Sequence, residues 1–130
     1  LRIGLLGGGS WGTTVASLVA RNSPTIMWAR SAEVVDEINQ YHRNEKYLPN
    51  STLTNSLVAS TSIKETVKDA DVIVVGVPSQ SFRQVLLDAR PYIRPWVPIV
   101  SLSKGLEQDT NMRMTQIIEE VMPGHPAGVL

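Results

Sequence analysis

The segment that decides the fold is LRIGLLGGGSWGTTVASLVARN, residues 1–22. Its apolar run over residues 2–6 is closed by three consecutive glycines, which is typical of a buried parallel strand followed by a turn. Glycine is costly inside regular structure but favourable where the backbone turns tightly or approaches a ligand closely. After the glycines, apolar residues recur at helical spacing until Asn22-Ser23-Pro24 ends the helix. The segment therefore predicts a strand, a tight turn and a helix that begins near Ser10.

The glycines fit the pattern G-x-G-x-x-G through Gly7, Gly9 and Gly12. In that pattern the first glycine permits the tight turn, the second lets backbone approach a pyrophosphate, and the third lets helix and strand pack closely. The helix that follows offers free N–H groups and the positive end of its dipole to the phosphate. Because the pattern lies between a predicted strand and a predicted helix, it indicates a dinucleotide site. The alternative is a glycine-rich turn that binds no ligand.

The rest of the chain alternates predicted strands with predicted helices. Strands are expected at 25–28, 57–59 and 71–78. A further strand is expected to end at Ser101 or Leu102, and a last strand to begin at 128–130. Helices are expected at 32–40 after the N-cap Ser31, at 62–68, from the cap Ser79 to Ala89, and from the cap Thr110 to Val121. Residues 41–55 read as a long surface loop. This alternation predicts an α/β fold with a doubly wound, mainly parallel sheet of the Rossmann type.

The composition excludes several classes of partner and site. Lys and Arg number 12 and Asp and Glu number 12, so we expect neither a nucleic-acid partner nor an anionic membrane partner. No apolar run approaches the roughly 20 residues needed to cross a bilayer. The chain has no cysteine, which excludes disulfides and thiolate metal sites, and it has two histidines far apart in sequence. We therefore expect no metal site and a cytoplasmic location.

The choice of cofactor depends on the residues that follow the second strand. Sites that prefer NAD usually place Asp or Glu there to accept hydrogen bonds from the ribose 2′-hydroxyl. Here Ala29, Arg30 and Ser31 occupy that place, and the first carboxylate is Glu33, inside the next helix. A guanidinium pairs well with a 2′-phosphate and also stacks on adenine. We therefore predict a preference for NADP(H), with NAD(H) as the alternative. The alternative interpretation of Arg30 is a solvated charge at the start of the helix that contacts no cofactor.

Four stretches carry a resemblance to a known family. They are GGGSWGTTVA, RNEKYLP, VVGVPSQSFR and SLSKGLE, in this order, and they extend from Ile3 to Glu107. In combination they resemble the bacterial NAD(P)-dependent glycerol-3-phosphate dehydrogenases. The departures are small: Gly8 replaces a more usual alanine, and Thr14-Val15 replaces Ala-Leu. The resemblance implies a doubly wound cofactor domain followed by a helical substrate domain.

The resemblance also implies roles for individual residues. Ser10 and Trp11 would line the pyrophosphate and nicotinamide side, Arg30 would meet the adenosine end, and Tyr47 would form a loop wall. Lys104 would contact both the cofactor and the phosphate or hydroxyl of the substrate. The implied reaction interconverts dihydroxyacetone phosphate and sn-glycerol 3-phosphate, a precursor of phospholipids, with NAD(P)H.

Lys104, Val77 and Pro78 each follow a predicted strand and are expected to face one crevice at the carboxyl ends of the strands. Lys104 lies just past the carboxyl end of a predicted strand, where ligands bind in open α/β sheets, and its alternative is an exposed loop charge. Val77 and Pro78 follow the most apolar strand and are expected to touch the nicotinamide ribose, together with Ser79 if that residue is more than a helix cap. Trp96 is expected to be a packing residue.

The family's proton-donating lysine lies in the second domain, so the resemblance implies that no catalytic residue lies in this chain. We interpret residues 1–130 as an NAD(P)-binding domain, truncated near its last strands and inactive by itself. A homodimer of the full-length protein is a further expectation. Two alternatives stay open: another two-domain NAD(P)-dependent dehydrogenase, such as a hydroxyacid or ketopantoate reductase, and a non-catalytic NAD(P)-sensing domain.

Overall fold

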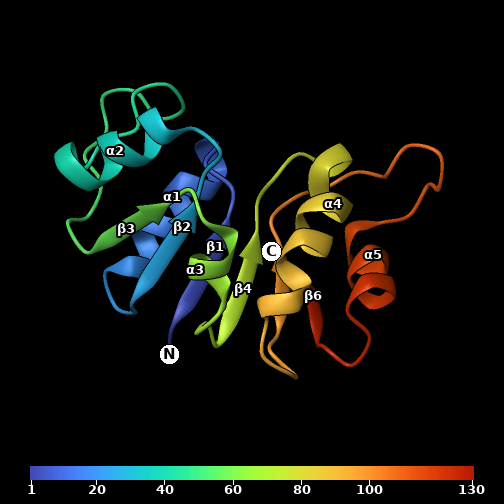
Figure 1. Cartoon of the computed structure of the whole chain (residues 1–130). Coiled ribbons are helices and arrows are strands. Elements are labelled where there is room, and N and C mark those ends of the chain that lie inside the picture. The colour runs from blue at the N-terminus through green and yellow to red at the C-terminus, as the bar shows by residue number, and fades with distance from the viewer.

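The computed structural model describes residues 1–130 and contains one six-stranded sheet in which every strand pair is parallel (Figure 1). The strands are β1 (Ile3–Leu6), β2 (Thr25–Trp28), β3 (Leu57–Ser60), β4 (Val72–Val75), β5 (Ile99–Ser101) and β6 (Ala127–Val129). Their spatial order is β3-β2-β1-β4-β5-β6. Successive crossovers from β1 run first toward one edge and then toward the other, which is the doubly wound arrangement. The predicted fold class is confirmed.

The helices cover both faces of this sheet. They are α1 (Ser10–Ala20), α2 (Ala32–Tyr41), α3 (Ile63–Val67), α4 (Ser79–Ala89) and α5 (Met114–Val121), with a short 3-10 helix at Arg90–Tyr92. Buried side chains of α1 and α2 belong to one apolar cluster, whereas those of α3, α4 and α5 belong to a second cluster on the opposite face. Each helix therefore buries one apolar stripe against the sheet.

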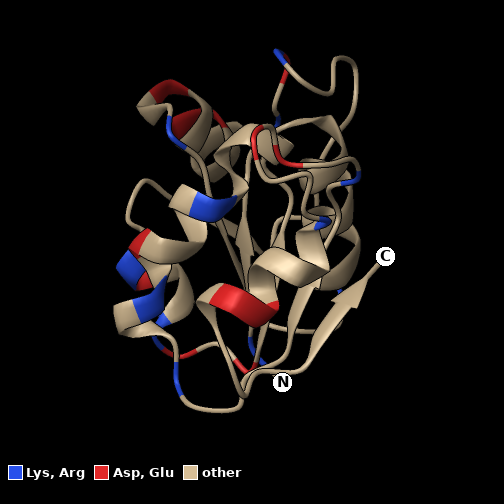
Figure 2. Cartoon of the chain, turned by 90° about the vertical axis from the view of Figure 1, so that its right-hand side faces the viewer, with Lys and Arg blue, Asp and Glu red and all other residues tan.

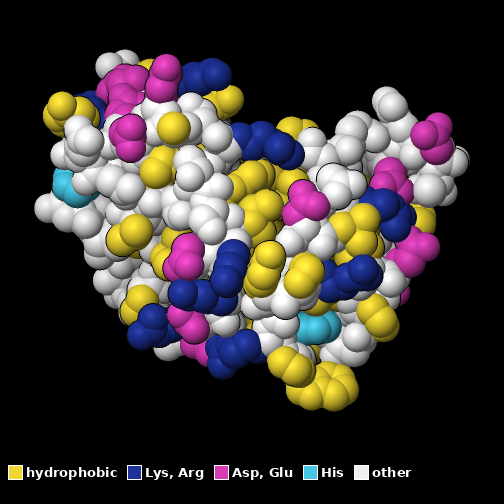
Figure 3. Space-filling model, in the orientation of Figure 1, with side chains coloured by type: hydrophobic (Ala, Val, Ile, Leu, Met, Phe, Trp, Pro, Cys, Tyr) yellow, Lys and Arg dark blue, Asp and Glu magenta, His cyan; other side chains and the backbone are white.

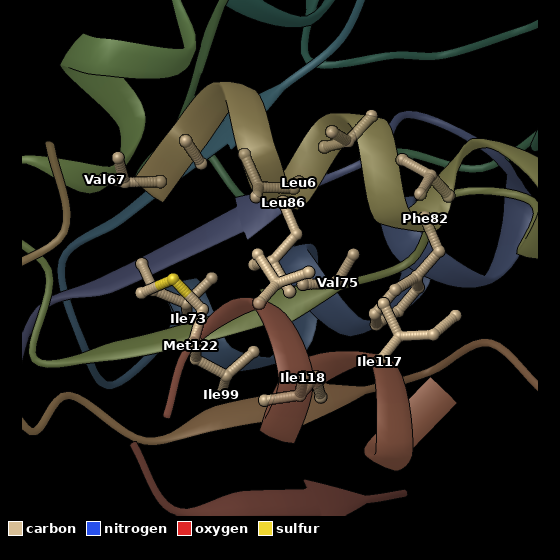
Figure 4. Close-up of a cluster of buried hydrophobic side chains, with 14 of the residues drawn as sticks. Leu6, Val67, Ile73, Val75, Phe82, Leu86, Ile99, Ile117, Ile118 and Met122 are labelled. Carbon is tan, nitrogen blue, oxygen red and sulfur yellow. The ribbon is translucent and has the colours of Figure 1, made fainter. Parts of the chain in front are cut away.

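The central strand β4 shows how the sequence divides the core between the two faces. Ile73 and Val75 belong to the cluster with α4 and α5, and Val74 between them belongs to the cluster with α1. Figure 4 shows Ile73 and Val75 among side chains from α4 and α5, including Phe82 and Ile118. Full burial of such a side chain stabilises the fold by about 1.5–3 kcal/mol. A strand buried on both faces must be apolar throughout, as β4 is.

The predicted N-cap Ser31 is confirmed, and Ser62, which was expected inside the helix at 62–68, caps α3 instead. The Ser31 hydroxyl accepts a hydrogen bond from the Val34 N–H at 3.3 Å, and the Ser62 hydroxyl accepts one from the Glu65 N–H at 3.1 Å. These bonds satisfy N–H groups that the first turn of a helix leaves without a partner.

Two other predicted caps are wrong. Ser79 is the first residue inside α4, and Pro78 is the N-cap. Thr110 does not begin α5, which starts at Met114 after the N-cap Arg113. The Thr110 hydroxyl instead lies 2.6 Å from a carboxylate oxygen of Glu107 and accepts from the Met112 N–H. These contacts keep residues 107–112 in a folded loop.

The prediction for Trp96 is also wrong, because its side chain is 73% exposed. Its backbone adopts a left-handed conformation with φ of 66°, in a segment bounded by Pro95 and Pro98. Only the edge of the indole approaches Gly124. The local backbone therefore turns the ring outward, which apolar character alone could not reveal.

The surface carries charges of both signs. In Figure 2 the Lys and Arg residues lie intermixed with Asp and Glu along the helices and loops. No helix of the chain has both the length and the apolar character that a membrane span requires.

Candidate dinucleotide-binding site

One cleft of about 750 Å³ opens at the carboxyl edge of the sheet. It is lined by the residues that directly follow β1, β2, β4 and β5, because parallel strands bring their carboxyl ends to one edge. The cleft lies where the strand order reverses between β1 and β4, the place where open α/β sheets bind ligands. In Figure 3 the surface is hollowed at the top, between the lobe that carries α2 and the lobe that carries α4.

The three glycines of the G-x-G-x-x-G pattern lie in different surroundings. Gly7 has φ of +135°, and a Cβ placed on it would lie 2.7 Å from the Gly76 carbonyl oxygen. A Cβ on Gly12 would lie 2.9 Å from the Gly7 carbonyl oxygen. A Cβ on Gly9 would meet no atom within 4 Å. Gly7 and Gly12 are thus required by the turn and by close packing, whereas Gly9 leaves space open on the cleft.

The amino end of α1 presents unpaired hydrogen-bond donors to this space. Its first turn holds no acidic residue, and its N-cap Gly9 supplies no side chain. The N–H groups of Gly9, Ser10, Trp11 and Gly12 find no acceptor within the chain, and the first paired N–H is that of Thr13. Such donors, together with the positive end of the helix dipole, attract an anion.

The residues after β2 form one end of the cleft. Trp28 is buried, and the exposed Arg30 guanidinium lies 5.2 Å from the centre of its ring. A guanidinium over an aromatic face is held electrostatically and keeps its planar surface available for stacking. Glu33, the nearest carboxylate in the sequence, does not line the cleft. This end of the cleft therefore carries positive charge without an opposing acid.

The loop after α2 forms the adjacent wall. Tyr47 is 38% exposed, and its backbone carbonyl accepts a hydrogen bond from the Ser10 hydroxyl, so the loop is attached to the start of α1. Lys46 also lines the cleft, with its ammonium 5.1 Å from the centre of the Tyr47 ring. Sequence reasoning missed Lys46, although its place beside Tyr47 in RNEKYLP is a signal that could have found it.

The opposite end of the cleft is built after β4 and β5. Val77 is buried, Pro78 is exposed, and the Ser103 hydroxyl donates to the Val77 carbonyl, which joins the two segments. Lys104 is exposed, forms no ion pair with the chain, and is followed by Gly105 with φ of +103°. Its ammonium is therefore free to meet an anionic ligand.

The segment after Lys104 is held in place from α4. Arg83 forms a bidentate pair with Glu107 at 2.9 and 3.0 Å and also reaches Glu120 of α5 at 2.6 Å. The hydrogen bonds with Arg83 hold the pKa of the Glu107 carboxyl below its usual value, and those with the carboxylates raise the pKa of Arg83. The pair is charged at neutral pH and ties the Lys104 loop to two helices. Sequence reasoning missed Arg83.

All ten residues predicted to bind the cofactor line this one cleft. They are Gly7, Gly9, Ser10, Trp11, Gly12, Arg30, Tyr47, Val77, Pro78 and Lys104. The other residues that line it are Gly8, Trp28, Ala29, Ser31, Val34, Lys46, Gly76, Ser79, Ser81 and Ser103. The chain holds no cluster of His, Cys, Asp and Glu that could bind a metal ion. The binding roles of the ten residues stay predictions.

Solved structures resemble the chain over nearly its whole length. The crystal structure of glycerol-3-phosphate dehydrogenase from Coxiella burnetii superimposes with a TM-score of 0.89 at 29% identity, covering 98% of this chain and 39% of that one. A ketopantoate reductase from Ralstonia eutropha superimposes with a TM-score of 0.71 at 16% identity, covering 99% of this chain and 40% of that one. The second likeness shows the fold alone.

Curated relatives are closer in sequence. The chain is 59% identical over 130 residues to glycerol-3-phosphate dehydrogenase [NAD(P)+] 2 of Sphingopyxis alaskensis, covering 100% of this chain and 39% of the relative. It is 58% identical to glycerol-3-phosphate dehydrogenase [NAD(P)+] 1 of Mycobacterium tuberculosis strain H37Rv, covering 99% of this chain and 38% of the relative. It thus spans about two fifths of the length of these relatives. The family model described as the NAD-dependent glycerol-3-phosphate dehydrogenase N-terminus matches residues 2–130, and the chain belongs to this family.

Proposed function

We propose that the cleft binds NADP(H) in preference to NAD(H), as the cofactor region of an oxidoreductase. In the longer polypeptide the reaction interconverts dihydroxyacetone phosphate and sn-glycerol 3-phosphate. The observation that carries the proposal is the row of four unpaired N–H groups at the start of α1, beside the open space at Gly9. The names of the relatives, at 58–59% identity, support the reaction and its substrate.

In the proposed complex, the pyrophosphate lies over residues 7–11. The adenosine end lies between Arg30 and Tyr47, and the nicotinamide lies toward Val77, Pro78 and Lys104. Arg30 supports the preference for NADP(H), because a guanidinium can pair with a 2′-phosphate that an Asp or Glu would repel. Its position over the Trp28 ring also suits stacking on adenine.

The proposed roles of this chain and of the substrate domain in the reaction follow from which side chains reach the cleft. The chain positions the hydride donor, and Lys104 anchors the phosphate or hydroxyl of the substrate. Carbonyl reduction also needs a proton donor at the developing alkoxide. We assign that proton to a lysine of the substrate domain, outside residues 1–130. A cytoplasmic location and a homodimer of the longer protein complete the proposal.

Titration of the 130-residue chain with NADPH and with NADH by calorimetry tests the proposal. We expect one cofactor to bind per chain, with NADPH at least about tenfold tighter, because one charge-assisted pair with a 2′-phosphate contributes on the order of 1.5–3 kcal/mol. Circular dichroism establishes that the chain is folded. A folded chain that binds neither cofactor at millimolar concentration would overturn the proposal.

Arg30→Asp is expected to reverse the preference between the two cofactors. The carboxylate repels the 2′-phosphate and can accept hydrogen bonds from a ribose 2′-hydroxyl, so NADPH affinity falls by about 10- to 100-fold while NADH affinity changes little. Arg21→Asp makes the same change of charge at an exposed residue outside the cleft and is the matched control. If Arg30→Asp weakens both cofactors equally, Arg30 only stacks on adenine and the preference for NADP(H) loses its basis.

A further inference from the structure

We propose that Asn44 is a positioning residue for the cofactor pyrophosphate. It fixes the peptide bond between Gly8 and Gly9 so that the Gly9 N–H faces the cleft. This inference rests on the proposed function, since it concerns the same cleft. It adds a residue that lies outside the glycine pattern and does not line the cleft itself.

Asn44 and Thr13 hold the Gly8 carbonyl from beneath the glycine loop. Both side chains are fully buried, with 0% of their surface exposed. The Asn44 amide donates to the Gly8 carbonyl oxygen at 3.2 Å and to the Thr13 hydroxyl at 3.0 Å. The Thr13 hydroxyl in turn donates to the same carbonyl oxygen at 3.3 Å. Because both donors are buried, the Gly8 carbonyl oxygen lies on the buried side of the loop.

The orientation of this carbonyl determines where the next N–H points. The chain contains no cis peptide bond, and in a trans peptide the C=O and N–H bonds point in opposite directions. With the Gly8 oxygen on the buried side, the Gly9 N–H points to the open side, where Gly8 and Gly9 line the cleft. That N–H has no acceptor in the chain. It is therefore a donor that an anion in the cleft can use.

The loop that carries Asn44 is attached on both sides of Gly9. Asn44 bonds to Gly8, and the backbone of Tyr47 accepts from the Ser10 hydroxyl. Within the loop, the Leu48 N–H donates to the Asn44 carbonyl at 2.8 Å, which fixes the spacing of the two attachments. The loop and the phosphate-facing backbone therefore form one hydrogen-bonded unit.

The polar atoms of Asn44 are engaged only through the amide nitrogen. Its Oδ1 is buried and has no hydrogen-bond partner, whereas the nitrogen donates to the Gly8 carbonyl and the Thr13 hydroxyl. A buried acceptor without a partner is costly, and the two donated bonds offset that cost. Both donated bonds hold the glycine loop.

Asn44→Asp tests the inference through the pH dependence of binding. A carboxylate cannot donate to the Gly8 oxygen and repels it, which favours turning the peptide so that the Gly9 N–H leaves the cleft. At pH 8 we expect NADP+ to bind at least about tenfold more weakly than to the unmodified chain. A buried carboxyl without a cation has a raised pKa, so at pH 5 its proton donates again and the deficit falls to about threefold or less. Quenching of Trp11 and Trp28 fluorescence reports binding, since both line the cleft.

Asn39→Asp is a control at an exposed asparagine that also holds backbone. The Asn39 side chain does so through two bonds, to the Ala59 carbonyl at 2.9 Å and from the Ala59 N–H at 2.8 Å, but it does not line the cleft. Its substitution is expected to lower thermal stability and to leave NADP+ affinity within about twofold at both pH values. A merely structural role for Asn44 would lower thermal stability in its variant without a binding deficit that changes with pH.

The other ionisable groups near Asn44 are the same in every variant. His42, Arg43, Glu45 and Lys46 neighbour it on the loop, and Glu37 of α2 accepts from the Glu45 N–H. The 2′-phosphate of NADP+ also titrates in this range. The affinity of each variant is expressed as a ratio to that of the unmodified chain at the same pH. This ratio removes the effect of titration of the other loop residues and of the 2′-phosphate on binding.

A second pair of variants applies if Asn44→Asp does not fold. Thr13→Val removes the hydroxyl that supports the Gly8 carbonyl, and Thr13→Ser keeps it. We expect NADP+ to bind at least about threefold more weakly to the valine variant and within about twofold of normal to the serine variant.

Four results would overturn the inference: normal NADP+ affinity of Asn44→Asp at pH 8, a deficit that does not change with pH, an equal deficit in Asn39→Asp, or equal affinities of the two Thr13 variants. Failure of the folded, unmodified chain to bind NADP+ would overturn the proposed function instead.

Discussion

Gly9→Val is expected to abolish binding of NADPH while leaving the fold intact. A Cβ on Gly9 meets no atom within 4 Å, so the valine side chain has room in the free chain. In the proposed complex, that room is the space in which the pyrophosphate approaches the N–H groups of α1. We expect the Kd for NADPH to rise at least about 100-fold, equivalent to about 2.8 kcal/mol. Calorimetry measures the affinity, and thermal denaturation measures the stability.

Two other glycines give the experiment its controls. Gly128 in β6 also has open space around its Cβ and lies outside the cleft, so Gly128→Val should leave NADPH affinity unchanged. A Cβ on Gly12 meets the Gly7 carbonyl oxygen at 2.9 Å, so Gly12→Val should lower the melting temperature as well as the affinity. Normal NADPH affinity in Gly9→Val would place the pyrophosphate elsewhere.

The 130-residue chain is expected to bind NADPH without reducing dihydroxyacetone phosphate, whereas the longer polypeptide is expected to do both. Reduction requires a hydride donor, a proton donor at the developing alkoxide, and a closed site that anchors the substrate phosphate. In the proposed complex, the chain supplies the first through its cleft and part of the third through Lys104. A well-placed general acid contributes typically 10²–10⁴-fold, so we expect turnover by the chain to be lower by at least about 10²-fold.

The side chains available as acids in this chain explain the expectation. His42 and His125 do not line the cleft, and Tyr41 lies 67% exposed at the end of α2 rather than in a loop. Tyr47 lines the cleft, but its hydroxyl forms no hydrogen bond within the chain, and only its backbone carbonyl accepts one. A steady-state assay of NADPH oxidation tests whether the chain alone reduces dihydroxyacetone phosphate. Oxidation by the chain that depends on dihydroxyacetone phosphate would show that the proton donor lies within residues 1–130, and Lys104→Gln would then be the first variant to examine.

The sequence by itself determined the fold class and the central part of the candidate site. Strand β4 is apolar at each position because it is buried on both faces, and such a run can be recognised without coordinates. The glycine pattern, Arg30 and Lys104 directly follow strands, so a parallel sheet must bring them to one edge. The helix cap Ser31 was also predicted from the sequence, since it bonds an N–H three residues away.

Tertiary structure alone decided which distant residues support that edge. Asn44 bonds to Gly8 across 36 positions of sequence, and Arg83 bonds to Glu107 across 24. Two wrong predictions have local causes instead: Thr110 bonds to the Glu107 carboxylate rather than capping α5, and a left-handed backbone turns Trp96 outward. Local patterns encode hydrogen bonds within a turn and the periodicity of apolar residues. The partner of a polar side chain across the fold depends on how the loops pack, which no local pattern records.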